Sequence, residues 1–211
     1  MTEKVKTGTT TLGMVCSDGI IIAADKRATV GNMIARGKID KVLPINERMA
    51  ITIAGTVSDA VLLVKLIKAE TRINKLKLGR HNTVKEAANL IGSLVYNNIR
   101  RMSVIAGVTH FIFAGMNDNG SFELYDIFPD GTVTRIDSFI SSGSGSSYAL
   151  GILQGYYKEN MSITEGVGVA KRAFDAALRN DSASGNGVDL YKLTTKGVEH
   201  IETIMLNTGL F

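Results

Sequence analysis

Runs of apolar residues divide the chain into short strand-like and longer helix-like segments. Residues 9–24 contain two β-rich runs separated by Ser17-Asp18-Gly19, and the Asp-Gly pair is typical of a tight hairpin turn. Further strand-like segments follow at residues 33–36, 41–45 and 48–53. The first quarter of the chain is therefore predicted to be β-structure.

Two helix-like segments come next, in which apolar residues recur every three or four positions. The first covers residues 58–77 and stops before Gly79, a residue type common at helix C-termini. The second begins at Thr83, because Thr83 and Glu86 have the spacing of an N-terminal capping box. Its single apolar stripe predicts that one face packs on a core.

The second half of the chain repeats this order. Three strand-like segments are separated by glycine-containing turns and cover residues 109–116, 121–128 and 132–136. Two helix-like segments follow at 146–159 and 163–179, the latter opened by a Ser162/Glu165 capping box. Strand-like segments then return at 187–194 and 198–204.

The element order indicates an α+β fold. It lacks the strict alternation of strand and helix that is typical of a parallel sheet. Two antiparallel sheets stacked face to face, with a helix pair over each outer face, would bury every apolar stripe. No linker or repeat is seen, and only residues 1–8 lie outside the pattern, so one domain is predicted.

Composition excludes several classes of protein. With 211 residues, 45% of them hydrophobic, and only 2 prolines, the chain is expected to fold rather than to be disordered. The net charge of +4 comes from scattered charges and argues against nucleic-acid binding, and no signal peptide or membrane span is visible. One cysteine, Cys16, permits neither an internal disulfide nor a cysteine-based zinc site, which favours a reducing compartment.

Taken singly, the candidate functional residues have ordinary structural interpretations. Thr9-Thr10-Thr11 could be the edge of a sheet, Asp25-Lys26-Arg27 could carry charge into solvent at a strand end, and Lys41 could reach solvent along a strand edge. Cys16 is predicted to be a small buried apolar residue. The three isolated histidines are predicted to be surface or packing residues, and Gly143-Ser144-Gly145 lacks the third glycine of a dinucleotide site.

Taken together, six ordered blocks make the chain resemble the N-terminal threonine hydrolases, and most closely the proteasome core-particle β-subunits of the archaeal type. The blocks are Gly8 before Thr9-Thr10-Thr11, Asp25-Lys26-Arg27, Lys41, Ala54-Gly55, Gly143-Ser144-Gly145-Ser146, and the run from Arg179 to Gly185. This resemblance implies the four-layer αββα sandwich of N-terminal nucleophile hydrolases. It further implies a propeptide at residues 1–8 and one catalytic domain at 9–211.

The resemblance also implies a site. Thr9 would be the nucleophile of a threonine endopeptidase, with its own α-amine as base once Gly8 is removed. Lys41 would lower the proton affinity of that amine, Asp25 would hold Lys41, and the Gly55 N–H would bind the oxyanion. The supporting network around the amine would be Ser144, Asp181 and Ser184. An apolar specificity pocket would be lined by Ala28, Thr29, Ile39, Ile53 and Val57.

Self-activation is the further expectation from this chemistry. Thr9 Oγ would attack the Gly8 carbonyl and release residues 1–8, because an amide nitrogen cannot serve as a base. Gly8 is expected to allow the tight backbone turn that this attack needs. A chain that still carries residues 1–8 is expected to be a precursor whose site is not yet formed.

The implied partners are other β-subunits in seven-membered rings, α-subunits, an unfolding ATPase acting through the α-ring, and unfolded polypeptide. No cofactor or metal is implied, and the expected location is the cytoplasm. One alternative is a catalytically silent ring subunit, which would not need Thr9, Asp25 and Lys41. Another is the bacterial two-ring threonine protease, which the eight-residue leader and the Asp181-to-Gly185 run disfavour.

Overall fold

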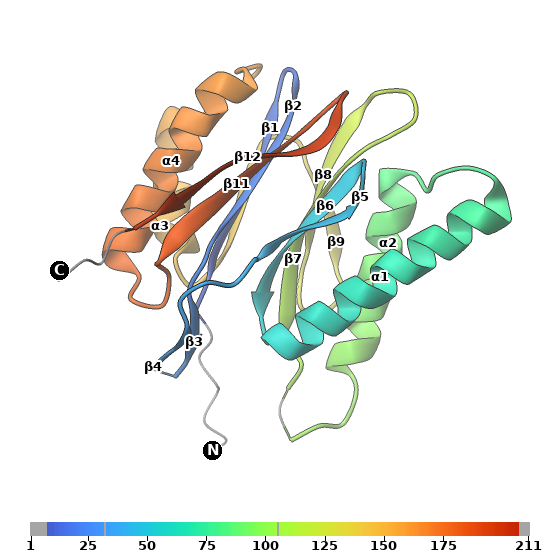
Figure 1. The fold of residues 1–211 in the computed structure, drawn as a ribbon, viewed down its shortest axis with the longest axis horizontal. Helices are drawn as coiled ribbons and strands as arrows, with labels where there is room; N and C mark the ends of the chain where they lie inside the picture. The colour runs from blue at the N-terminus through green and yellow to red at the C-terminus, as the bar shows by residue number, and fades with distance from the viewer. Residues whose placement is uncertain (1–7, 32, 105, 207–211) are drawn as a thin grey trace.

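The computed structural model describes residues 8–31, 33–104 and 106–206, which form two stacked sheets between two helix pairs (Figure 1). The first sheet is antiparallel and has the order β10-β1-β2-β11-β12. Its strands are β1 (Thr10–Cys16), β2 (Gly19–Asp25), β10 (Phe139–Gly143), β11 (Gly187–Thr194) and β12 (Gly197–Met205). Helices α3 (Ser146–Tyr156) and α4 (Ile163–Asn180) cover its outer face (Figure 1).

The second sheet is also antiparallel and follows chain order from β5 to β9. Its strands are β5 (Val42–Asn46), β6 (Met49–Gly55), β7 (Thr109–Met116), β8 (Phe122–Ile127) and β9 (Val133–Ile136). Helices α1 (Val57–Leu78) and α2 (Val84–Ile99) cover its outer face (Figure 1). A small hairpin of β3 (Ala28–Val30) and β4 (Met33–Arg36) connects the two sheets.

Three apolar clusters hold the four layers together. Successive side chains of a strand point to opposite faces of the sheet, so β2 contributes to two of the clusters. Ile21 and Ala23 pack under α3 and α4, whereas Ile20 and Ile22 pack against the second sheet. A third cluster lies between the second sheet and helices α1 and α2. The predicted αββα sandwich is confirmed.

The predicted helix ends follow from local sequence and are confirmed. Thr83 Oγ1 accepts a hydrogen bond from the Glu86 amide at 3.1 Å, and the Glu86 carboxylate accepts one from the Thr83 amide at 2.9 Å. Ser162 and Glu165 form the same reciprocal box at the start of α4. Gly79 ends α1 with a φ of 65°, a left-handed conformation that glycine adopts without strain.

The sequence does not predict strand β10, because only its first two residues, Phe139 and Ile140, are strong strand formers. Residues 141–143 are serine, serine and glycine, which are common in turns. β1 supplies the partner: Leu12 lies opposite Ser141, and Thr11 and Ser142 are joined through their hydroxyls at 2.7 Å. Strand β3 was also missed, and α3 ends at Tyr156 rather than at residue 159.

Within residues 8–31, 33–104 and 106–206, no helix is long and apolar enough to cross a membrane.

Candidate active site

Thr9 lies directly before β1, a strand with a partner on each side. β10 pairs with one edge of β1 and β2 with the other, and Thr9 itself is buried. The interpretation of Thr9-Thr10-Thr11 as the edge of a sheet is therefore wrong, because β10 covers that edge. Thr9 therefore lies in the interior of the sandwich, where side chains from both sheets can contact it.

Lys41 reaches Thr9 from the second sheet. It lies immediately before β5, and its Nζ is 3.0 Å from Thr9 Oγ1 and 2.7 Å from Oδ1 of Asp25, the last residue of β2. Lys41 is 3% exposed and Asp25 is 0% exposed, so the interpretation of both as solvent-facing charges is wrong. A buried charge is tolerated when it is paired and hydrogen-bonded. Lys41 and Asp25 form such a pair, in which each is the ion-pair and hydrogen-bond partner of the other.

Backbone amides fix the Asp25 carboxylate. Oδ1 accepts a hydrogen bond from the Thr10 amide at 3.0 Å, and Oδ2 accepts one each from Arg27 and Gly185 at 3.0 Å. Burial raises the pKa of Asp25, while Lys41 and these amides oppose the shift. Burial also lowers the pKa of Lys41, against the opposing effect of Asp25. Lys41 therefore gives up a proton more readily than an exposed lysine does.

The Gly8–Thr9 peptide bond lies beside the Thr9 hydroxyl. Oγ1 of Thr9 donates a hydrogen bond to the Gly8 carbonyl at 2.6 Å, and the Gly8 amide donates to Oγ1 of Thr29 at 2.8 Å. A side chain at Gly8 would overlap Ala183. The need for glycine thus comes from close packing against another segment, which was not the predicted reason.

The expectation that the site is unformed in a chain carrying residues 1–8 is wrong. Thr9, Asp25 and Lys41 are already in hydrogen-bond contact while Gly8 is joined to Thr9. The fold of the single chain is therefore sufficient to bring these three side chains together.

Ser144, Asp181 and Ser184 form a network next to the Thr9 nitrogen. That nitrogen donates to Ser144 Oγ at 3.2 Å, and the hydroxyls of Ser144 and Ser184 donate to Asp181 Oδ2 at 2.6 and 2.7 Å. Ser144 lies just before α3, and Asp181 caps the C-terminus of α4. The packing of these two helices therefore sets the geometry around the nitrogen, and the orienting role of the network stays a prediction.

Gly55 ends β6 in a conformation that only glycine adopts readily. Its φ is 98°, and a Cβ here would overlap the carbonyl oxygen of Val108. The Ile53 amide donates to the Lys41 carbonyl at 2.9 Å, and amides two residues apart in a strand point to the same edge. We therefore expect the Gly55 N–H to point toward Lys41, and its predicted role as oxyanion donor stays a prediction.

The predicted pocket residues come from separate elements. Ala28 and Thr29 lie on β3 and are buried, Ile39 is half-buried between β4 and β5, and Val57 is half-buried at the start of α1. Ile53 is 3% exposed and packs in the cluster beneath α1 and α2. Their joint role in binding substrate stays a prediction.

Two contributors to the site were missed by sequence reasoning. Arg27 Nε donates to Oδ1 of Asn186 at 2.6 Å, and another of its guanidinium nitrogens donates to the Ser182 carbonyl at 2.8 Å, which holds the loop carrying Ser184. Thr10 Oγ1 forms a hydrogen bond with Ser184 Oγ at 2.8 Å. Both residues belong to blocks that carried the resemblance, but residue type alone gave them no role.

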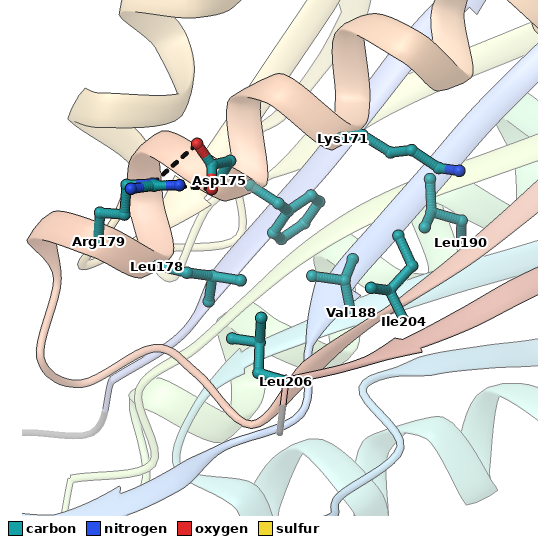
Figure 2. A pocket seen from close by; sticks show the side chains of 9 residues that line it. Lys171, Asp175, Leu178, Arg179, Val188, Leu190, Ile204 and Leu206 are labelled. Atoms are coloured by element: carbon teal, nitrogen blue, oxygen red, sulfur yellow. Dashed lines mark hydrogen bonds and ion pairs between the residues drawn. The ribbon is translucent and has the colours of Figure 1, made fainter. Parts of the chain in front are cut away.

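An apolar hollow of about 350 Å³ lies between α4 and the β11–β12 hairpin (Figure 2). Val188, Leu190 and Ile204 line it from the strands, while Lys171 and the Asp175–Arg179 ion pair lie along α4 (Figure 2). Nothing in the sequence pattern predicted this hollow.

Among residues 8–31, 33–104 and 106–206, no cluster of His, Cys, Asp and Glu could hold a metal ion. Cys16 is buried, and burial is the main cause that raises the pKa of its thiol to about 12. The prediction that Cys16 is a packed apolar residue is confirmed.

Comparison with known proteins gives consistent results. The model of the proteasome subunit family matches residues 5–193. "Proteasome subunit beta" of Ferroglobus placidus is 38% identical over 200 residues, which cover 95% of this chain and 92% of that protein. "Proteasome subunit beta" of Methanococcus maripaludis is 36% identical, with 91% of this chain and 86% of that protein covered. "Proteasome subunit beta 1" of Thermococcus gammatolerans is 37% identical, with 94% and 95% covered.

Proposed function

Since this chain belongs to the proteasome subunit family and is a β-type subunit of the proteasome core, we propose that it is a threonine endopeptidase that cleaves unfolded polypeptide through Thr9. One observation carries the proposal: the buried Lys41 ammonium lies 3.0 Å from Thr9 Oγ1 while Asp25 holds it at 2.7 Å. A subunit with only a structural role would not need a buried ion pair at a threonine hydroxyl.

The proposed reaction starts from the mature chain, in which Thr9 is the first residue. Its α-amine, with an ordinary pKa of about 7.7 to 8.0, accepts the hydroxyl proton as Oγ1 attacks the substrate carbonyl. The positive charge of Lys41 lowers the pKa of the amine toward neutral pH. The Gly55 N–H stabilises the oxyanion, the amine proton passes to the departing amine, and water hydrolyses the resulting ester.

The proposed maturation uses the same hydroxyl. Thr9 Oγ1 attacks the Gly8 carbonyl carbon, the Gly8–Thr9 amide bond breaks, and an ester between Gly8 and Thr9 Oγ1 forms. The proton leaves Oγ1 for a water, or for Lys41 Nζ in the uncharged form that burial favours, and is then delivered to the nitrogen that becomes the free amine. Water then hydrolyses the ester and releases residues 1–8. The proposed attack is supported by the 2.6 Å hydrogen bond between Thr9 Oγ1 and the Gly8 carbonyl oxygen, which keeps the hydroxyl beside the group it would attack.

Membership of this family implies assembly with other subunits into a multisubunit complex. We propose stacked seven-membered β-rings closed by α-rings, with an unfolding ATPase acting through the α-ring, in the cytoplasm. The contact of Thr9, Asp25 and Lys41 disfavours the alternative of a catalytically silent subunit. Coverage of nearly the whole length of archaeal β-subunits favours this assembly over the bacterial two-ring protease.

Intact mass and peptide cleavage test the proposal together. The chain is co-produced with α-subunits as wild type, Thr9→Ala and Thr9→Ser, with no other active subunit present. We expect the wild type and Thr9→Ser to lose residues 1–8 and to cleave peptides, because both keep a hydroxyl. Thr9→Ala should assemble, keep residues 1–8 and be inactive.

Two results would contradict the proposed function. Normal trimming of Thr9→Ala would show that another protease removes the leader. An assembled, trimmed wild type that cleaves no peptide would favour the silent subunit.

A further inference from the structure

A second buried charge cluster lies beside the catalytic pair and has no part in the chemistry described above. Lys26 forms an ion pair with Asp189 of β11 and another with Asp40, whose Oδ1 lies 3.0 Å from Lys26 Nζ. The Lys26 and Asp189 side chains are 8% and 7% exposed, whereas that of Asp40 is 78% exposed. Thr203 Oγ1 donates to the other Asp189 oxygen at 2.6 Å.

Chain neighbours link the two clusters. Asp25 and Lys26 are adjacent at the end of β2, and Asp40 and Lys41 are adjacent just before β5. Asp25 binds Lys41, and Lys26 binds Asp40, so the two dipeptides form crossed ion pairs. Because neighbouring side chains of an extended chain point to opposite faces, Lys26 can hold Asp40 on one face while Asp25 holds Lys41 on the other.

The segment that these pairs hold has little structure of its own. Residues 38–41 form neither helix nor strand. Two backbone hydrogen bonds hold this segment: the Ile39 amide donates to the Lys26 carbonyl at 3.0 Å, and the Ile53 amide donates to the Lys41 carbonyl at 2.9 Å. A shift of this segment by one residue would put Asp40 beside Asp25 in one direction, or Lys41 beside Lys26 in the other. Either shift breaks both ion pairs and brings like charges into contact, so the charge order selects the observed register.

Asp189 holds the Lys26 side chain in place. Ala24 faces the second sheet, and Lys26 lies two residues farther along the same face, where Asp189 of the adjacent β11 meets it. Burial alone would lower the pKa of Lys26, but its hydrogen bonds to Asp189 and Asp40 raise it. Lys26 therefore keeps its positive charge at neutral pH, between the carboxylates of Asp189 and Asp40.

We infer that Lys26, with Asp189 and Asp40, is a positioning residue that sets the register of residues 38–41 and so places Lys41 Nζ at the Thr9 hydroxyl. The inference rests on the proposed function, because it assigns these residues to the rate of Thr9 chemistry. Because these residues act by placing Lys41, their substitution should change the rate of turnover, kcat, and not the binding of substrate.

The variants for the test are Asp40→Asn, Lys26→Gln and Lys26→Arg in assembled, processed particles. The control is Glu199→Gln, which breaks the Lys192–Glu199 pair on β11 and β12 of the same sheet. kcat and KM are measured for a peptide with an apolar residue before the cleaved bond. Active sites are counted with a covalent threonine-directed probe, and thermal unfolding is followed in parallel.

We expect Asp40→Asn to lower kcat per active site about 3- to 10-fold and Lys26→Gln to lower it 10-fold or more, because a small displacement of a catalytic group is costly. KM should stay within about twofold, and Lys26→Arg and Glu199→Gln should keep kcat within about twofold of the wild type. Asp40 is exposed, so Asp40→Asn is expected to assemble. If Lys26→Gln fails to assemble, the kcat of Asp40→Asn alone decides whether the inference holds.

Unchanged kcat per active site in Asp40→Asn and Lys26→Gln, even with a lowered unfolding temperature, would overturn the inference. A loss confined to KM would also overturn it. Peptide cleavage by Thr9→Ala would instead overturn the proposed function, so the two failures are distinguishable.

Discussion

At the scale of single residues, the site depends on one buried lysine held by one buried carboxylate. Asp25 engages both of its oxygens with backbone amides and one of them with Lys41 as well. Removal of either partner leaves the other as an unpaired buried charge, which is strongly unfavourable. The two residues should therefore act as one unit in function.

We expect Lys41→Ala and Asp25→Asn each to lower kcat/KM by about 100-fold or more, since proton transfer and positioning typically contribute on that scale. The double variant should be little worse than either single variant, because coupled residues are not additive. The rate of peptide hydrolysis and the intact mass measure turnover and processing.

Lys171→Ala is the matched control, because this lysine of α4 forms a half-exposed pair with Glu202 of β12 at 2.5 Å and, within the described part of the chain, has no hydrogen bond or ion pair with Thr9, Asp25 or Lys41. It should leave both readouts unchanged. A Lys41→Ala variant that assembles and cleaves at the normal rate would show that the proposed mechanism is wrong.

At the scale of elements, helix α2 offers a test of local stability. The pKa of Glu86 is lowered to about 2. The largest cause is its hydrogen bond with Arg80, and the next is the hydrogen bond from the Thr83 amide. Glu86 is ionised in the capping box, so its contribution is fully present above its unfolded pKa of about 4.3. This contribution is lost as the pH falls through the folded pKa of about 2.

We therefore expect Glu86→Gln to unfold at a lower temperature than the wild type at pH 7, by about 2–4 °C for each kcal/mol lost. The difference should shrink as the pH is lowered toward 2. Thermal unfolding followed by circular dichroism measures both.

Glu70→Gln, at an exposed position within α1, is the control and should match the wild type throughout. A Glu86→Gln difference that is constant with pH would contradict the role of the ionised carboxylate.

At the scale of the whole molecule, the stacking of two sheets decides which residues lie together at the candidate site. Thr9 directly precedes β1 and β3 comes after β2 of the first sheet, whereas Lys41 directly precedes β5 of the second sheet and Gly55 ends β6, before α1. The predicted pocket residues Ala28, Ile39, Ile53 and Val57 carry no charge. A charged substrate side chain placed among them would lose its hydration without gaining a partner.

Peptides that differ only in the residue before the cleaved bond test this pocket. We expect the assembled particle to cleave after Leu and Tyr faster than after Arg and Glu, with kcat/KM as the measure. Equal or faster cleavage after Arg or Glu would show that the pocket residues are misassigned. A preparation made in parallel without this chain identifies cleavage by contaminating proteases.

The sequence by itself determined most elements and their ends. The β1–β2 hairpin, the two capping boxes and the glycine stop of α1 depend on residues close together in the chain, so local propensity and turn chemistry are enough to predict them. The stacked αββα layers also followed, because each apolar stripe needs a face to cover it. The residues of the site were found through the resemblance of ordered blocks, since threonine, aspartate and lysine taken singly have ordinary structural roles.

The tertiary structure alone decided which segments became partners and which charges became buried. β10 is a strand because β1 offers it a ladder of hydrogen bonds across more than a hundred residues of sequence. Asp25, Lys26 and Lys41 are buried because segments distant in the chain supply opposite charges and amides, and Gly8 is confined by Ala183. A local sequence pattern predicts which side of an element is apolar, because that depends on neighbouring residues. It does not predict which charges are buried, because burying a charge is unfavourable unless folding brings it a partner from elsewhere in the chain.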